Sequence, residues 1–162
     1  MSDPTTTLIQ QVRSLQERRY PTALVVLDSG IPSIDDLRLV AQACALQCID
    51  YREDVLAGPD SNVVLGAYTR TSFRDWLISQ ARDYGGIIIW NVDELIATWE
   101  EYDRKAFYID FLHIESNSVD DRSRKAPVVL LSRLAESFAL PTRDRGQGIV
   151  TRAFTQTVQG GM

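Results

Sequence analysis

One stretch of the sequence, residues 85–94 (GGIIIWNVDE), decides the fold class. Four consecutive apolar residues, Ile87 to Trp90, follow a pair of glycines and precede a polar segment. A short apolar run without alternating polar residues is typical of a strand that is buried on both faces, as the strands of a parallel sheet are. The glycine pair predicts the end of the preceding helix, and we expect the next helix to run from about Val92 to His113.

Similar apolar runs recur along the chain, and the segments between them have apolar residues at helical spacing. The predicted strands are 23–27, 47–51 and 127–131, with a last edge strand at 149–150. The predicted helices are 5–19, 34–44, 72–84 and 134–138. Because strands and helices alternate, the sequence predicts a three-layer α/β sandwich with a mainly parallel sheet.

The length of the chain bounds the number of domains. With 162 residues we expect a single α/β domain over 1–162, with its core at about 21–140 and a flexible basic tail at 141–162. Residues 52–62 are predicted as a loop and 116–125 as an exposed polar segment, and 63–65 either form a further short strand or simply pack.

Two of the predicted helices carry a start signal. Ser33 with Asp36 and Ser72 with Asp75 have the spacing of a capping box. In the long predicted helix at 92–113, one apolar stripe consists of Leu95, Trp99, Tyr102, Ala106 and Ile109, and it is widened by Ile96, Phe107 and Phe111. This stripe is wider than one sheet face needs, so we expect part of it to form a partner surface.

Composition excludes several classes of protein. Hydrophobic residues make up 44% of the chain and charged residues 24%, which excludes wholesale disorder. No apolar run reaches the roughly 20 residues that cross a bilayer, and the N-terminus lacks the features of a signal peptide. We therefore expect a cytoplasmic protein with no membrane partner.

The cysteines and the single histidine predict no metal site. Cys44 and Cys48 lie four residues apart, a spacing that favours two buried thiols on one face. A zinc site needs further ligands, and His113 is the only histidine. A lone histidine is also weak support for a catalytic base, and no G-x-S-x-G motif occurs.

Charge is distributed unevenly along the chain, whose net charge is −5. Residues 92–115 hold seven acidic and two basic residues, whereas residues 116–162 hold four acidic and seven basic residues. We expect the acidic and basic parts to meet between copies of the chain, giving a homo-oligomer, or to face another partner. The residues assigned to this partner or nucleic-acid surface are Trp99, Glu100, Glu101, Arg143, Arg145 and Arg152.

The order of strand, turn, capped helix and a later strand followed by Asp93-Glu94 resembles P-loop NTPases of the AAA type, over about residues 23–135. Residues 87–95 are similar to the Walker B segment of that family. The resemblance implies that Asp93 would hold Mg²⁺ through water and that Glu94 would polarise the attacking water. It also implies a polar sensor at Ser132 or Arg133, and a phosphate loop at the turn that contains Ser29 and Gly30.

The phosphate loop itself departs from the G-x-x-x-x-G-K-[ST] pattern. The turn at 28–33 has one glycine and no lysine, and Pro32 removes one backbone donor. Acidic residues at Asp28, Asp35 and Asp36 would repel a triphosphate. We therefore predict that Ser29, Gly30, Asp93 and Glu94 are vestiges of a nucleotide site, that no cofactor is bound, and that ATP is not hydrolysed.

The predicted function is a non-catalytic adaptor or structural subunit that docks on a partner protein, such as an active ATPase. By its size and single-domain layout the chain is most similar to the small P-loop subunit of bacteriophage-exclusion (BREX) defence systems. That resemblance implies a role in an antiviral assembly.

Two alternatives remain open at this stage. Strand-end carboxylates can hold Mg²⁺ in a small nuclease, and residues 26–29 are faintly similar to the opening of PIN-type ribonucleases. The carboxylates concerned are Asp28, Asp50, Asp93 and Glu94. The second alternative is a nucleic-acid-binding module, in which Arg143, Arg145 and Arg152 of the tail contact phosphates.

Overall fold

The computed structural model describes residues 3–28, 32–56, 68–138, 147–152 and 154. One parallel sheet has the strand order β2-β3-β4-β1-β5. Its strands are β1 (Thr22–Val26), β2 (Gln47–Asp50), β3 (Ile87–Trp90), β4 (Val128–Ser132) and β5 (Ile149–Thr151). The helical elements are α1 (Pro4–Ser14), η1 (Leu15–Glu17), α2 (Ile34–Cys44), η2 (Tyr51–Leu56), α3 (Arg70–Tyr84), α4 (Asp93–Ile96), α5 (Glu101–Phe111) and η3 (Leu134–Ser137).

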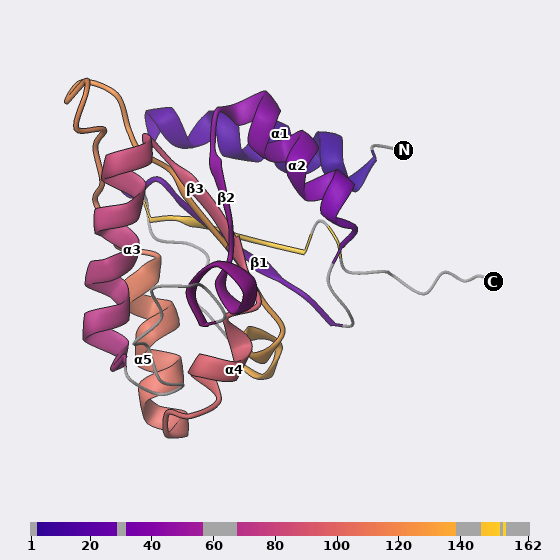
Figure 1. The fold of residues 1–162 in the computed structure, drawn as a ribbon, viewed down its shortest axis with the longest axis vertical. Helices are drawn as coiled ribbons and strands as arrows, with labels where there is room; N and C mark the ends of the chain where they lie inside the picture. Colours follow the sequence, from indigo (N-terminus) through magenta and orange to yellow (C-terminus); the bar gives the residue numbers. More distant parts are fainter. Residues whose placement is uncertain (1–2, 29–31, 57–67, 139–146, 153, 155–162) are drawn as a thin grey trace.

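Helices cover both faces of the sheet, which confirms the predicted three-layer α/β sandwich. Alternate side chains of β1 point to opposite faces, as strand geometry requires. Ala23 and Val25 pack with α1 and α2, whereas Leu24 and Val26 pack with α3 and α5. Figure 1 shows the two helical layers on either side of the strands.

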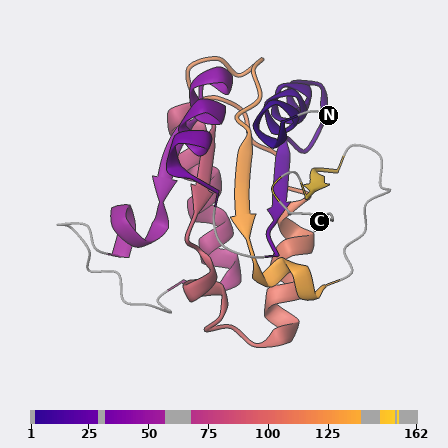
Figure 2. The same cartoon turned by 90° about the vertical axis from the view of Figure 1, so that its right-hand side faces the viewer.

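The carboxyl ends of the strands lie along one edge of the sheet. Val26 pairs with Ser132 where β1 and β4 end, and Ile89 pairs with Leu130 where β3 runs beside β4. Figure 2 shows β4 running beside β1 and leading directly into η3. Residues that follow β1, β3 and β4 are therefore brought together, and this edge is where open α/β sheets place their functional groups.

The edge strand predicted at 149–150 is present as β5, which pairs with β1. The chain enters this strand in close contact with β1, because a Cβ atom at Gly148 would lie 1.9 Å from Thr22 Oγ1. The Gly148 amide also donates to the Leu112 carbonyl at 2.8 Å. Part of the tail predicted as flexible thus belongs to the sheet.

The long helix predicted at 92–113 is wrong, since the structure divides it into α4 and α5. The chain turns at Trp99, whose indole Nε1 donates to the Tyr68 carbonyl at 2.9 Å. Glu100 then adopts an extended conformation (φ −69°, ψ 158°) before α5 begins. The guanidinium of Arg104 donates to the carbonyls of Ile96 and Ala97, at 3.2 and 2.9 Å, and so satisfies the end of α4.

Because of this break, the predicted apolar stripe is also partly wrong. The buried face of α5 consists of Phe107, Tyr108 and Phe111. Tyr102, which the continuous helix would place in the core, is 77% exposed. Inserting a turn between two helical segments rotates the second one, so a stripe that is counted across the break cannot hold.

The two predicted helix starts have different outcomes. The Ser33 hydroxyl accepts the Asp36 amide at the start of α2, as expected. Ser72 and Asp75 do not open α3, because a capping box between Thr69 and Ser72 starts that helix three residues earlier. The short helix predicted at 134–138 is present as the 3-10 helix η3 (Leu134–Ser137). The predicted strand at 47–51 ends one residue early, where Tyr51 enters the π-helical turn η2.

Residues 63–65, for which a short strand was one expectation, lie outside the described residues. The segment at 116–125 is largely exposed, although the side chains of Ser116 and Ser118 are buried. Within the described ranges, every helix is too short or too polar to cross a membrane.

Candidate functional site

Three polar side chains meet where β3 and β4 end. Asp93 lies in the first turn of α4, directly after β3, and Ser132 is the last residue of β4. Tyr108 reaches the same place from α5. Each is positioned by a different element, so the contact depends on the packing of α5 against the sheet.

The carboxylate of Asp93 accepts three hydrogen bonds from the β4–η3 junction. The Ser132 hydroxyl donates to Oδ1 at 2.6 Å, and the Arg133 amide donates to Oδ2 at 2.9 Å. The Leu134 amide adds a longer bond to Oδ1 at 3.4 Å. Asp93 therefore acts as a cap for η3, since it satisfies backbone donors that the short helix leaves free.

Tyr108 completes a chain of hydrogen bonds that leads away from Asp93. Its hydroxyl lies 2.7 Å from Ser132 Oγ, and because the single proton of Ser132 goes to Asp93, Tyr108 is the donor in this pair. Burial raises the pKa of Tyr108, and the nearby Asp93 charge acts in the same direction, while the hydrogen bond with Ser132 opposes them. The phenol stays protonated and serves as a fixed donor.

A second polar cluster lies at the ends of β2 and β3. Asn91 has a left-handed backbone conformation (φ 61°), which asparagine tolerates better than most residues. Its side-chain amide donates to Asp50 Oδ1 at 2.9 Å, and the Arg52 amide donates to the same oxygen at 3.1 Å. The Asp54 carboxylate in turn accepts the Asp50 amide at 2.8 Å. These contacts hold the turn of η2 against the end of β3.

Glu94, the second acidic residue of the Walker B-like segment, points elsewhere. It forms an ion pair with Arg52, and both side chains are about half exposed, at 46% and 50%. An exposed pair of this kind contributes little to stability. Glu94 thus links α4 to η2, whereas Asp93 links α4 to the β4–η3 junction.

The predicted vestigial site is therefore only partly assembled among the described residues. The structure brings Asp93 together with Ser132, one of the two residues predicted as a sensor, and the backbone amide of the other, Arg133, also donates to Asp93. Ser29 and Gly30 lie outside the described residues. In the part of the chain that the structure describes, no three His, Cys, Asp or Glu side chains gather as possible metal ligands.

The residues assigned to a partner surface divide into two groups. Trp99 is only 9% exposed and belongs to the core, so its assignment to the surface is wrong. Glu100 and Glu101 are exposed at the start of α5, and the adjacent Tyr102 is exposed as well. We call Glu100, Glu101 and Tyr102 the acidic tip.

The structure describes one of the three arginines assigned to the tail surface. Arg152 forms an ion pair with Glu136, beside η3. Arg143 and Arg145 lie outside the described residues.

Sequence reasoning missed Tyr108 and Asn91 as members of the strand-end clusters. Tyr108 was missed because the helical phase of 92–113 was counted as if no break occurred. Asn91 carried a usable signal, since an asparagine directly after a buried strand favours a left-handed turn. The chain matches no protein-family model and no curated protein.

Proposed function

We propose that this protein is a non-catalytic adaptor or structural subunit, built on a degenerate P-loop NTPase-like core, which docks on a partner protein. The observation that carries the proposal is the occupied carboxylate of Asp93. In the Walker B resemblance this residue would hold Mg²⁺, but here its two oxygens accept the Ser132 hydroxyl and the Arg133 and Leu134 amides. A metal ion would have to compete with these three donors.

The other strand-end acids support the same conclusion. Asp50 accepts the Asn91 side chain and the Arg52 amide, and Glu94 is paired with Arg52. Hydrolysis of a phosphodiester or of ATP needs carboxylates that are free to hold a metal or to activate water. Three of the four candidate acids, Asp50, Asp93 and Glu94, are engaged in contacts that hold turns together, whereas Asp28 is exposed after β1. One exposed carboxylate does not make a metal site, so a nuclease or an ATPase is not favoured.

Docking on a partner is supported by the acidic tip. Tyr102 is 77% exposed at the start of α5, next to two exposed carboxylates. Tyrosine is enriched at protein interfaces because its ring buries a large area and its hydroxyl still finds a partner. The partner that fits this surface is a protein with a basic face around an apolar pocket. An active ATPase of a larger defence assembly, as the BREX resemblance implies, is the candidate to test first.

The loss of catalysis is tested by a thermal-shift series with ATP, ADP, GTP, Mg²⁺ and Mn²⁺. A ligand at 100 times its Kd stabilises the folded state by about 2.7 kcal/mol. For a chain of this size that would raise Tm by several degrees, roughly 2–4 °C per kcal/mol. We expect no shift with any of them and no cleavage of single- or double-stranded nucleic acid. A saturable shift with a nucleotide, or metal-dependent cleavage, would overturn the proposal.

Docking is tested by placing a photo-cross-linking amino acid at position 102 in the cell of origin. We expect one discrete cross-linked partner, which Glu100→Lys with Glu101→Lys abolishes. The matched control carries the cross-linker at Leu39, which is 53% exposed on α2 in the opposite layer. If both positions give the same weak smear of products, the acidic tip is not a docking surface.

A salt titration separates the nucleic-acid alternative. Binding to nucleic acid through the tail would weaken steeply with salt, because each phosphate contact releases counterions. We expect no measurable binding at physiological salt. Affinity that falls when Arg143 and Arg145 are neutralised would favour the nucleic-acid module instead.

A further inference from the structure

The outer face of α3 is a continuous stripe of charged, polar and apolar side chains at the edge of the molecule. Figure 1 shows α3 at the outside of its helical layer. The members of this face, which we call the α3 face, are Arg74, Asp75, Ile78, Ser79, Arg82 and Asp83. Asp75, Ile78, Ser79 and Arg82 lie on one side of the helix, whereas Arg74 and Asp83, which are two and a half turns apart, lie on its two opposite flanks. The core side of the same helix consists of Phe73, Leu77 and Ala81.

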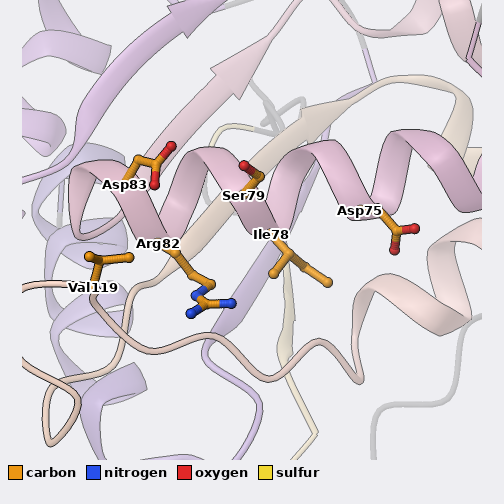
Figure 3. A pocket seen from close by; sticks show the side chains of 6 residues that line it. All are labelled: Asp75, Ile78, Ser79, Arg82, Asp83 and Val119. Carbon is orange, nitrogen blue, oxygen red and sulfur yellow. The ribbon is translucent and has the colours of Figure 1, made fainter.

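A hollow of about 330 Å³ runs along the α3 face and is bordered by the loop that carries Val119. Figure 3 shows Ile78 and Arg82 on the side of α3 that faces this loop. The Val119 amide donates to the Arg82 carbonyl at 3.1 Å, and the Val119 side chain is 54% exposed. The hollow therefore has an apolar border held in place by a backbone contact.

The charges on the α3 face are self-complementary. When two identical helices pack antiparallel about a two-fold axis, residues at equal distances on either side of the axis face each other. An axis that passes between Ile78 and Ser79 places Arg82 of one copy opposite Asp75 of the other. The same axis brings the two Ile78 side chains together on one flank of the contact and the two small Ser79 side chains together on the other.

In this register the charges attract each other, whereas in the two adjacent registers they repel. Moving the axis by half a residue toward Ile78 places Arg74 opposite Arg82. Moving it by the same amount toward Ser79 places Asp75 opposite Asp83. Like charges in contact disfavour both alternatives. The sequence of the face thus specifies both the antiparallel direction and the register.

We infer that the α3 face binds a second copy of this chain in an antiparallel, two-fold symmetric dimer. Two symmetry-related Asp75–Arg82 ion pairs flank a centre formed by the exposed parts of the two Ile78 side chains, which otherwise pack against the core of their own chain, and one Val119 closes each end. Within one chain, Asp75 forms an ion pair with the adjacent, partly buried Arg74 at 3.3 Å. The dimer gives Arg82 an opposite charge as well.

The contact is small, so the dimer is expected to be weak. α3 has 15 residues and is therefore about 22 Å long. One helix pair with two flanking loops lies near the lower limit of specific interfaces, about 1,200 Å² in total. The dimer population should rise with protein concentration and fall with salt, because exposed ion pairs are screened.

A charge-exchange experiment on the full chain tests the inference by analytical ultracentrifugation. The wild type is expected to approach twice its mass of 18.3 kDa as concentration rises. Asp75→Arg and Arg82→Glu each place two like-charged pairs across the axis. Each single variant should dissociate at least about tenfold more readily and sediment as a monomer.

Mixing the two variants makes the test specific for this geometry. An Asp75→Arg chain beside an Arg82→Glu chain has opposite charges at both contacts, so the mixture should dimerise although neither variant does so alone. The double variant should also dimerise. Recovery on mixing shows that both variants are folded. Asp35→Arg makes the same charge change as Asp75→Arg at an exposed position of α2, in the other helical layer, and should behave as the wild type.

Three results would overturn the inference. The first is a wild type that remains a monomer at several hundred micromolar. The second is association of the single variants as strong as that of the wild type, and the third is a mixture of the two variants that does not dimerise. Open-ended growth to larger species that ignores the charge exchange would indicate the head-to-tail assembly that the charge asymmetry of the sequence predicts, and not the α3 dimer.

Discussion

At the scale of single residues, the same side chain can serve a reaction or a fold, and its hydrogen bonds decide between the two. Asp93 follows a buried strand, as a metal-binding aspartate would, but three donors from the β4–η3 junction occupy its oxygens. Its role in the structure is to connect the start of α4 to the end of β4 through these hydrogen bonds. The proposed loss of catalysis rests on this difference.

The capping role of Asp93 predicts a clear loss of stability in Asp93→Ala. The substitution leaves Ser132 and two backbone amides without their acceptor, and we expect the free energy of unfolding to fall by about 2–3 kcal/mol. Urea denaturation measures this. Glu94→Ala is the control, since it removes an exposed ion pair worth at most about 1 kcal/mol. Equal effects of the two substitutions would contradict the capping role.

Two buried tyrosines predict opposite effects of the same chemical change. The Tyr51 hydroxyl is buried and has no hydrogen-bond partner within the part of the chain that is described, whereas the Tyr108 hydroxyl donates to Ser132. Tyr51→Phe should leave the free energy of unfolding unchanged or raise it by about 1 kcal/mol. Tyr108→Phe should lower it by about 1–2 kcal/mol. Denaturant titrations of both variants give the comparison, and a larger loss in Tyr51→Phe would show that its hydroxyl has a partner.

At the scale of elements, the break between α4 and α5 determines which residues the second helix buries. Arg104 satisfies the carbonyls of Ile96 and Ala97, and Trp99 anchors the turn through the Tyr68 carbonyl. These contacts hold a non-helical turn within a stretch of helical composition. The exposed position of the acidic tip follows directly from that turn.

Arg104→Met tests the contacts at this break. Methionine keeps an apolar stem of similar length but removes both hydrogen bonds to the end of α4, so we expect the free energy of unfolding to fall by about 1–2 kcal/mol. Lys105→Met is the matched control because Lys105 is exposed and adjacent. Circular dichroism with urea denaturation checks both variants. If Lys105→Met costs as much, the loss comes from the removed charge and not from the carbonyl contacts.

At the scale of the whole molecule, the buried hydroxyl groups predict how stability depends on pH. Burial raises the pKa of both Tyr51 and Tyr108 above the value of 10.0 for an unperturbed tyrosine. Because the pKa is raised in the folded state, the contribution of each tyrosine to the free energy of unfolding is complete below pH 10. It is lost as the pH rises above 10, because the unfolded chain then releases the phenol proton and the folded chain does not.

The expected loss above pH 10 is about 1.4 kcal/mol per pH unit for each such tyrosine. Urea denaturation between pH 9 and pH 11 measures the slope for the wild type and for Tyr108→Phe. Tyr108→Phe starts from a lower free energy of unfolding, but this free energy should fall less steeply with pH because one of the two titrating tyrosines is absent. Parallel slopes would show that Tyr108 does not contribute to the alkaline transition.

The sequence by itself determined the layers of the fold and the predicted strand segments at 23–27, 87–90, 127–131 and 149–150, because uninterrupted apolar runs need burial on two faces wherever they occur. Patterns within a single segment also gave the Ser33 cap and the acidic character of the region around α5. These features depend on residues that are close together in the sequence, so they can be predicted from the sequence alone.

Only the tertiary structure decided which polar groups meet. Ser132 lies 39 residues from Asp93, and Tyr108 lies on a third element, so their contact requires the strand order and the rotation of α5 together. The break at Trp99 likewise depends on the Tyr68 carbonyl, 31 residues away. Hydrogen bonds over such separations form only after packing, and for that reason no pattern along the chain could predict that Asp93 caps η3, that Tyr102 is exposed or that Tyr108 is buried.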